Sequence, residues 1–135
     1  MWRKILGGVA GYLGWWLIGT IGFVSLRVLW PEYASVEQAM TFTFSMQISR
    51  LLVGLLCSVG AGIIVYLVVR QRSVVPWVLG IVLLIQFLFV HYFIWAKFPI
   101  WYHAFFLLTL APTVVLGSRW AANRQEQKGT SPTTA

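Results

Sequence analysis

The chain has 135 residues, of which 59% are hydrophobic, 16% are aromatic and only 10% are charged. This composition leaves too little polar surface to solvate a globular domain of this size, so it excludes an ordinary soluble fold. The formal charge of +7 would suit nucleic acid, but the cations flank apolar segments instead of forming the basic patch that nucleic-acid binding needs. The composition therefore predicts that the chain's partner is the lipid bilayer and not nucleic acid.

Four apolar segments without Asp, Glu, Lys or Arg follow one another along the chain: residues 5–26, 51–69, 75–96 and 100–117. A helix needs roughly 20 such residues to cross about 30 Å of hydrocarbon. The sequence thus predicts an all-α, polytopic membrane protein, with four transmembrane helices in an antiparallel bundle over residues 1–119. Residues 120–135 lack apolar periodicity, and we expect them to form a disordered cytoplasmic tail.

Lys and Arg residues are distributed unevenly between the two sides of this four-span arrangement. Because cytoplasmic loops of membrane proteins are enriched in Lys and Arg, seven cations against three predict that both termini are cytoplasmic. Short connections are typical of a bacterial cytoplasmic membrane protein. The seven are Arg3, Lys4, Arg70, Arg72, Arg119, Arg124 and Lys128, and the three are Arg27, Arg50 and Lys97.

Small residues recur at helical spacing in the first two segments, where they would let helices approach closely inside the bundle or between subunits. The connections at 70–74 and 97–99 are short, which predicts that the second to fourth helices are antiparallel neighbours. A glutamine deep in the third segment predicts a hydrogen bond between helices. The expected packing residues are Gly7, Gly11, Gly14, Gly22, Gly54, Ser58, Gly62 and Gln86.

The start of the second helix is open between two positions, near Arg50 or near Val36. The earlier start is favoured by Ser35 and Gln38, which have the spacing of a capping box. A helix from Val36 would extend beyond the outer membrane surface. On it, Thr43, Gln47 and Arg50 would share one line, which is either a packing seam with a snorkelling arginine or the lining of an outward-facing polar cavity for an anionic or polar group.

Two histidines, His91 and His103, flank the turn at Lys97 to Pro99 and are expected at similar depth on adjoining helices. Two imidazoles can ligate a metal or haem, but metal sites usually have further ligands, and no Cys, Asp or Glu stands close in sequence. The sequence therefore predicts no metal and no cofactor. Bis-histidine haem binding is kept as a third alternative.

Motifs of known enzyme classes are missing, since the chain has one cysteine, no aspartate and no Gly-rich phosphate loop. We therefore expect no enzymatic activity. The first hypothesis is a non-catalytic accessory or homo-oligomeric protein that works through helix packing with itself or with a membrane-protein partner. The alternative is a small transporter or outward-facing ligand-binding bundle that uses Arg50, Gln47, His91 and His103, with Thr43 beside them.

Overall fold

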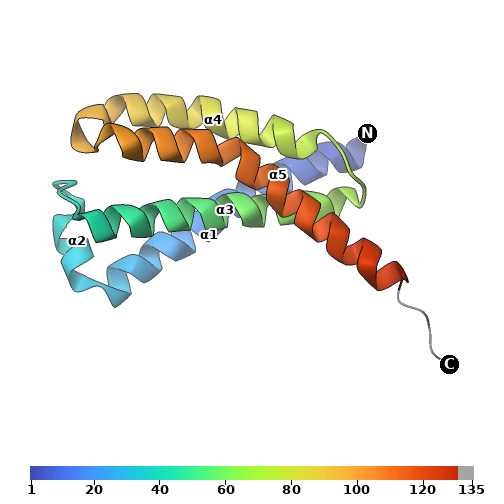
Figure 1. The fold of residues 1–135 in the computed structure, drawn as a ribbon, viewed down its shortest axis with the longest axis horizontal. Helices are drawn as coiled ribbons and strands as arrows, with labels where there is room; N and C mark the ends of the chain where they lie inside the picture. Colours follow the sequence, from blue (N-terminus) through green and yellow to red (C-terminus); the bar gives the residue numbers. More distant parts are fainter. Residues whose placement is uncertain (131–135) are drawn as a thin grey trace.

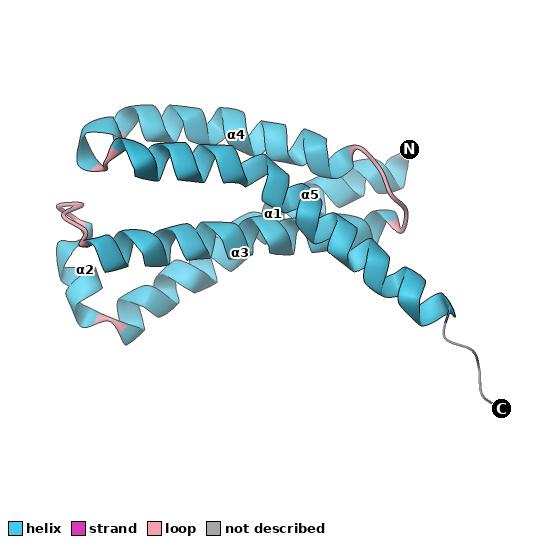
Figure 2. Ribbon diagram, in the orientation of Figure 1, coloured by secondary structure: helices cyan, strands magenta, loops and turns pink. Residues whose placement is uncertain are grey.

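The computed structural model describes residues 1–130, which are helical throughout apart from short connections and contain no β-strand (Figure 2). The helices are α1 (Trp2–Leu29), α2 (Pro31–Glu37), α3 (Phe44–Val69), α4 (Val75–Phe93), the 3-10 helix η1 (Trp95–Lys97) and α5 (Ile100–Thr130). Four of them, α1, α3, α4 and α5, are long and apolar enough to cross a membrane. The predicted all-α fold with four spans is confirmed, and the chain has the architecture of an integral membrane protein.

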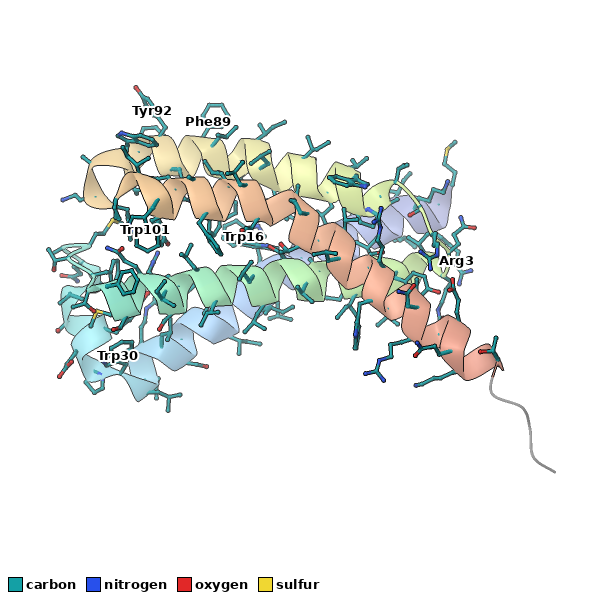
Figure 3. The ribbon with its side chains drawn as sticks, viewed as in Figure 1. Arg3, Trp16, Trp30, Phe89, Tyr92 and Trp101 are labelled. Carbon is teal, nitrogen blue, oxygen red and sulfur yellow. The ribbon has the colours of Figure 1, made fainter. Side chains whose placement is uncertain are left out.

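The bundle has two ends, which we call the α2 end and the terminal end, and they carry different elements (Figure 1). The α2 end holds α2, the segment 38–43 and the turn between α4 and α5. The terminal end holds the start of α1, the loop 70–74 and the last turns of α5. Between the two ends the exterior is apolar, as a lipid environment requires. Figure 3 shows Phe89 and Tyr92 pointing away from α4, and their side chains are among the most exposed in the chain.

Helix α1 packs against α3 along a glycine seam, and the two helices run in opposite directions. Along α1, the glycines from Gly7 to Gly22 contact first Val69, then Ile64 and finally Val53 of α3, so the residue numbers fall along α3 as they rise along α1. A methyl group on any of these glycines would overlap a side chain of α3, so close approach of the helices depends on them. The seam comprises Gly7, Gly11, Gly14 and Gly22.

Helices α3 and α5 run in the same direction and approach each other still more closely. A methyl group on Gly62 would overlap the Val114 backbone, and one on Gly117 would overlap the Val59 backbone. Towards the α2 end, Gly54 lies against the ring of Phe106. The small residues expected to pack helices are therefore engaged inside this single chain.

Helix α4 lies outside this pairing, against α5, where Gly80 meets the backbone of Ala111. Its contact with α3 is marginal. The prediction that the second and third spans are neighbours is wrong, although the loop that joins them is short. The reason is the backbone contact between α3 and α5, which leaves no room for α4 between them.

The second span starts between the two alternative positions, near Val36 and near Arg50, and the earlier alternative is wrong. Helix α2 ends at Glu37, Met40 has a positive φ of 53°, and α3 begins at Phe44 with Thr43 as its N-cap. Ser35 does not cap a helix start, because it lies within α2 and its hydroxyl donates to the Glu32 carbonyl. The tertiary contacts of the connecting segment, described below, outweigh the local helix signal.

The C-terminal prediction is wrong for residues 120–130, which continue α5 as a regular helix instead of forming a disordered tail. Ala121 and Ala122 are buried against Tyr66 of α3. Farther along, Arg72 forms an ion pair with Glu126. These contacts and the good helix formers between them hold the extension in place. Residues 131–135, the rest of the predicted tail, lie outside the described part of the chain.

Candidate functional site

Aromatic side chains close the α2 end of the bundle in a continuous stack, which we call the aromatic cap: Tyr33, Phe42, Phe98 and Tyr102. Ring centroids are 5.1 Å apart for the first pair, 5.7 Å for the second and 4.4 Å for the third. The four rings come from α2, the segment before α3, the residue after η1 and the start of α5. All four side chains are buried, and the insertion of Phe42 explains why the chain leaves helical geometry there.

Arg50, in the second turn of α3, lies against this cap and connects its two outer members. Its Nε donates to the Tyr102 hydroxyl at 3.4 Å, and its Nη1 donates to the Tyr33 hydroxyl. The guanidinium also lies over three phenylalanine rings, at 4.6 to 5.7 Å from their centroids. These contacts are cation–π interactions, which gain strength where water is partly excluded. The rings belong to Phe23, Phe42 and Phe98.

Arg50 has no carboxylate partner within residues 1–130, where the two ion pairs are Arg27–Glu37 and Arg72–Glu126. The Tyr33 hydroxyl does not supply a negative charge, because burial raises the pKa of Tyr33 even though the nearby Arg50 lowers it. A half-buried cation is thus held by neutral oxygens and aromatic rings. This arrangement leaves its charge uncompensated.

Thr43 and Gln47, which were predicted to share a line with Arg50, do not hydrogen-bond to its guanidinium. Thr43 is the N-cap of α3, and its hydroxyl accepts a hydrogen bond from the Met46 amide at 3.5 Å. The Gln47 side chain donates to the Phe42 carbonyl at 3.3 Å. Both side chains therefore satisfy backbone groups where the helix begins. The predicted line of three polar residues on one helix face is not formed.

His91 and His103 meet across the α4–α5 hairpin, with their Nδ1 atoms 2.7 Å apart, and both are buried. The Nε2 atom of His103 lies 3.3 Å from the Trp95 carbonyl. A carbonyl only accepts, so this nitrogen carries the proton of a neutral His103, whose Nδ1 is then an acceptor. His91 consequently donates through Nδ1, and its own Nε2 is left as the basic nitrogen of the pair.

Tyr102 connects the histidine pair to Arg50. Its hydroxyl accepts from Arg50, and its ring is stacked on His91 with centroids 6.0 Å apart. Three of the predicted ligand-binding residues, Arg50, His91 and His103, therefore belong to one polar and aromatic cluster at the α2 end. Ring contacts and hydrogen bonds join the three, and none of them lines any of five cavities found in residues 1–130.

The histidine pair does not fit a metal or haem bridge in this conformation. Metal–imidazole bonds of about 2.0–2.1 Å place two nitrogens on one ion more than about 3 Å apart. The facing Nδ1 atoms are closer than that and share a hydrogen bond. Within residues 1–130 no group of three or more His, Cys, Asp or Glu side chains is placed to hold a metal.

Two further hydrogen bonds join helices deeper in the bundle. Tyr12 of α1 donates to Gln86 of α4 at 3.0 Å, and Trp15 of α1 donates to Ser58 of α3 at 3.1 Å. Gln86 therefore makes an interhelical hydrogen bond, while Ser58 accepts one. No buried side-chain nitrogen or oxygen in the described residues lacks a partner.

Sequence reasoning missed the residues that hold Arg50 and the acid that pairs with Arg27. Neither Tyr33 nor Tyr102 is among the residues predicted to bind a ligand. Arg27 and Glu37 form a bidentate ion pair, with contacts of 2.6 and 2.9 Å. The bond to Arg27 is the main reason that the pKa of Glu37 lies below its ordinary value. The sequence did hold a signal for the Arg27–Glu37 pair: Glu37 is one of only three acids in the chain, so few carboxylates could pair with Arg27.

Comparison with protein-family models, with curated proteins and with solved structures gives no match for this chain.

Proposed function

We propose that the chain is a non-catalytic integral membrane protein that acts as an accessory or assembly subunit of another membrane protein. The observation that carries this proposal is that the polar side chains inside the bundle have their hydrogen bonds satisfied within the chain. The deep polar groups are bonded to one another, as in the Tyr12–Gln86 and Trp15–Ser58 pairs. No carboxylate lies in the apolar segments 5–26, 51–69, 75–96 and 100–117. Such an interior supports a stable, packed role and offers no carboxylate for acid–base chemistry at membrane depth.

Self-association through the glycine ridges is the less favoured form of this proposal. Gly11 and Gly62, which were candidates for contacts between subunits, pack against α3 and α5 of the same chain. A partner would therefore meet the exposed apolar faces, for example around Leu13 and Leu17 of α1 or Ile85 and Phe89 of α4.

Both termini are proposed to lie in the cytoplasm, in a bacterial cytoplasmic membrane. The support is the charge distribution, because all seven cations of the richer group belong to the start of α1, the loop 70–74 or the second half of α5, at the terminal end of the bundle (Figure 1). The α2 end, with the aromatic cap and the histidine pair, would then face outward.

The test is purification of the full tagged chain from its own membranes in mild detergent after brief crosslinking. A stoichiometric partner is expected, together with its loss when one exposed face is altered by Ile85→Trp and Phe89→Trp. Leu13→Trp and Leu17→Trp alter the α1 face, and each pair of variants is the control for the other, because a partner that meets one face should be retained when the other face is altered. A monodisperse chain with no partner would contradict the accessory role, and equal loss from both faces would show general damage.

A second candidate function, binding of a small anion at the α2 end, rests on the uncompensated charge of Arg50. The aromatic rings and tyrosine hydroxyls around it resemble the lining of a polar ligand site. This candidate includes a small transporter that presents the site outward. It predicts that carboxylate or phosphate anions raise the thermal stability of the wild type and of Lys97→Gln, but not of Arg50→Gln. The same shift in all three would exclude Arg50 from anion binding.

A further inference from the structure

A cavity of about 260 Å³ lies at the terminal end, between the loop 70–74, the start of α4 and the middle of α5. It is separate from the cluster around Arg50, which lies at the opposite end of the bundle. Its polar lining consists of Arg72, Ser73, Ser118 and Arg119, and Trp77 forms part of its wall. Two guanidinium groups and two hydroxyl groups thus line one small space.

The two arginines differ in what holds them. Arg72 is fixed by Glu126, at 3.2 Å, and by Asn123, at 2.7 Å. Arg119 is exposed and takes part in neither ion pair of residues 1–130. One cation is therefore neutralised and positioned while the other keeps its full charge, so the lining has a net positive charge.

The backbone adds to this positive character. Helix α4 has 19 residues and begins at Val75, directly beside the cavity. Pro76 has no amide hydrogen, and the Val78 amide donates to the Val74 carbonyl, so the contribution of the helix is mainly its dipole, which favours an anion there. Ser73 accepts from the Val75 amide at 3.4 Å, which fixes the turn that leads into the helix.

The depth of the cavity points to lipid. It lies where α4 enters its apolar span, and Trp77, which is 45% exposed, is the kind of side chain that occupies the headgroup region. Basic pockets between transmembrane helices on the cytoplasmic side are known to bind anionic headgroups. A soluble phosphate anion could bind the same polar groups, but it has no acyl chains to contact the adjoining apolar surface.

We propose that this cavity binds the phosphate group of an anionic phospholipid from the leaflet at the terminal end. Arg119 supplies the free charge, Arg72 a positioned donor, and Ser73 and Ser118 the hydroxyl groups. Trp77 contacts the glycerol and upper acyl region. The site does not depend on the proposed accessory role, because it uses none of the exposed faces discussed for a partner.

The test compares lipid retention by the full chain in native mass spectrometry after reconstitution with phosphatidylglycerol or phosphatidylcholine. Wild type is expected to retain phosphatidylglycerol preferentially, and Arg119→Gln to reduce this preference about fivefold, the effect of one basic residue near a membrane surface. Arg124→Gln is the matched control, because it removes the same charge from the same helix. Its guanidinium lies over the Trp120 ring at 5.1 Å and does not line the cavity.

Three results would overturn the proposal. Equal loss in Arg119→Gln and Arg124→Gln would show general surface electrostatics. No preference in the wild type would exclude a phospholipid site. Displacement of the lipid by millimolar glycerol phosphate would assign the cavity to a soluble anion. Melting curves in phosphatidylcholine alone, expected to be equal for the two variants, show that each is folded.

Discussion

The Nδ1 atoms of His91 and His103 face each other at 2.7 Å, in the buried wall between α4 and α5. Among residues 1–130, no other side-chain hydrogen bond joins α4 directly to α5. The Trp95 carbonyl accepts the proton on Nε2 of His103, which fixes the tautomer of His103 and therefore makes His91 the donor in the bond between the two Nδ1 atoms.

Removal of one histidine should destabilise the hairpin by more than the loss of the bond itself, because the partner nitrogen is left buried. A double-mutant cycle with His91→Ala and His103→Ala isolates the coupling, expected at about 0.6 to 1.7 kcal/mol, the range found between membrane helices. Unfolding by denaturing detergent provides the measurement. A coupling of zero would mean that the two rings do not share a hydrogen bond in the membrane.

Gly62→Ala should disrupt the α3–α5 crossing, since the added methyl group would overlap the Val114 backbone, which cannot move aside as a side chain can. Overpacking of this kind typically costs about 1–3 kcal/mol. Gly8→Ala is the matched control, because its methyl group would lie at ordinary contact distance, 3.6 Å from Val75. Thermal denaturation in detergent should show a lower Tm for the first variant only, and equal Tm values would refute the close crossing.

The Arg27–Glu37 ion pair should make stability depend on acid pH. Hydrogen bonding to Arg27 lowers the pKa of Glu37 below its ordinary value of 4.5, so the pair contributes fully above that value. The contribution is lost as the pH falls through the lowered pKa of the folded state. The side chains are partly exposed, so the effect is modest, about 0.2–1 kcal/mol.

Glu37→Gln should therefore be less stable than the wild type at pH 7 and equal to it in strong acid. Unfolding measured from pH 7 to pH 3 tests this, and high salt should reduce the difference at pH 7. A difference that grows as the pH falls would have the wrong sign for this ion pair.

The proposed topology predicts that reporters fused after Thr130 behave as cytoplasmic proteins. A green fluorescent protein fusion at that position should be fluorescent, and an alkaline phosphatase fusion should be inactive. A phosphatase inserted in the segment 38–43 should be active instead. The reverse pattern would place the aromatic cap in the cytoplasm and move the charge-rich end outside.

Hydropathy was sufficient to predict the number of spans, because lipid requires each span to be long, apolar and helical. It could not predict which helices touch. The loop between Val69 and Val75 is short, yet the glycine contact of Gly62 with α5 separates α3 from α4. Pairing depends on side-chain shape across the bundle, which no local pattern contains.

The candidate site was predictable in part for a related reason. His91 and His103 were expected at similar depth because a short turn joins their helices, and the structure places them in contact. The surroundings of Arg50 were not foreseen. They depend on Phe42, which leaves the expected helix to stack between Tyr33 and Phe98. A local capping signal at Ser35 was outweighed by the burial of an aromatic ring, a tertiary effect.

The parallel contact between α3 and α5 also constrains the order of assembly. During synthesis, Gly54 and Gly62 of α3 leave the ribosome long before Val114 and Gly117, which lie in the contact surface of α5. Before α5 is made, α1 can pair with α3 and with α4, but the α5-facing side of α3 has no partner. The core closes when the last helix arrives, so a chain truncated before Gly117 would expose a small-residue surface that other membrane helices can occupy.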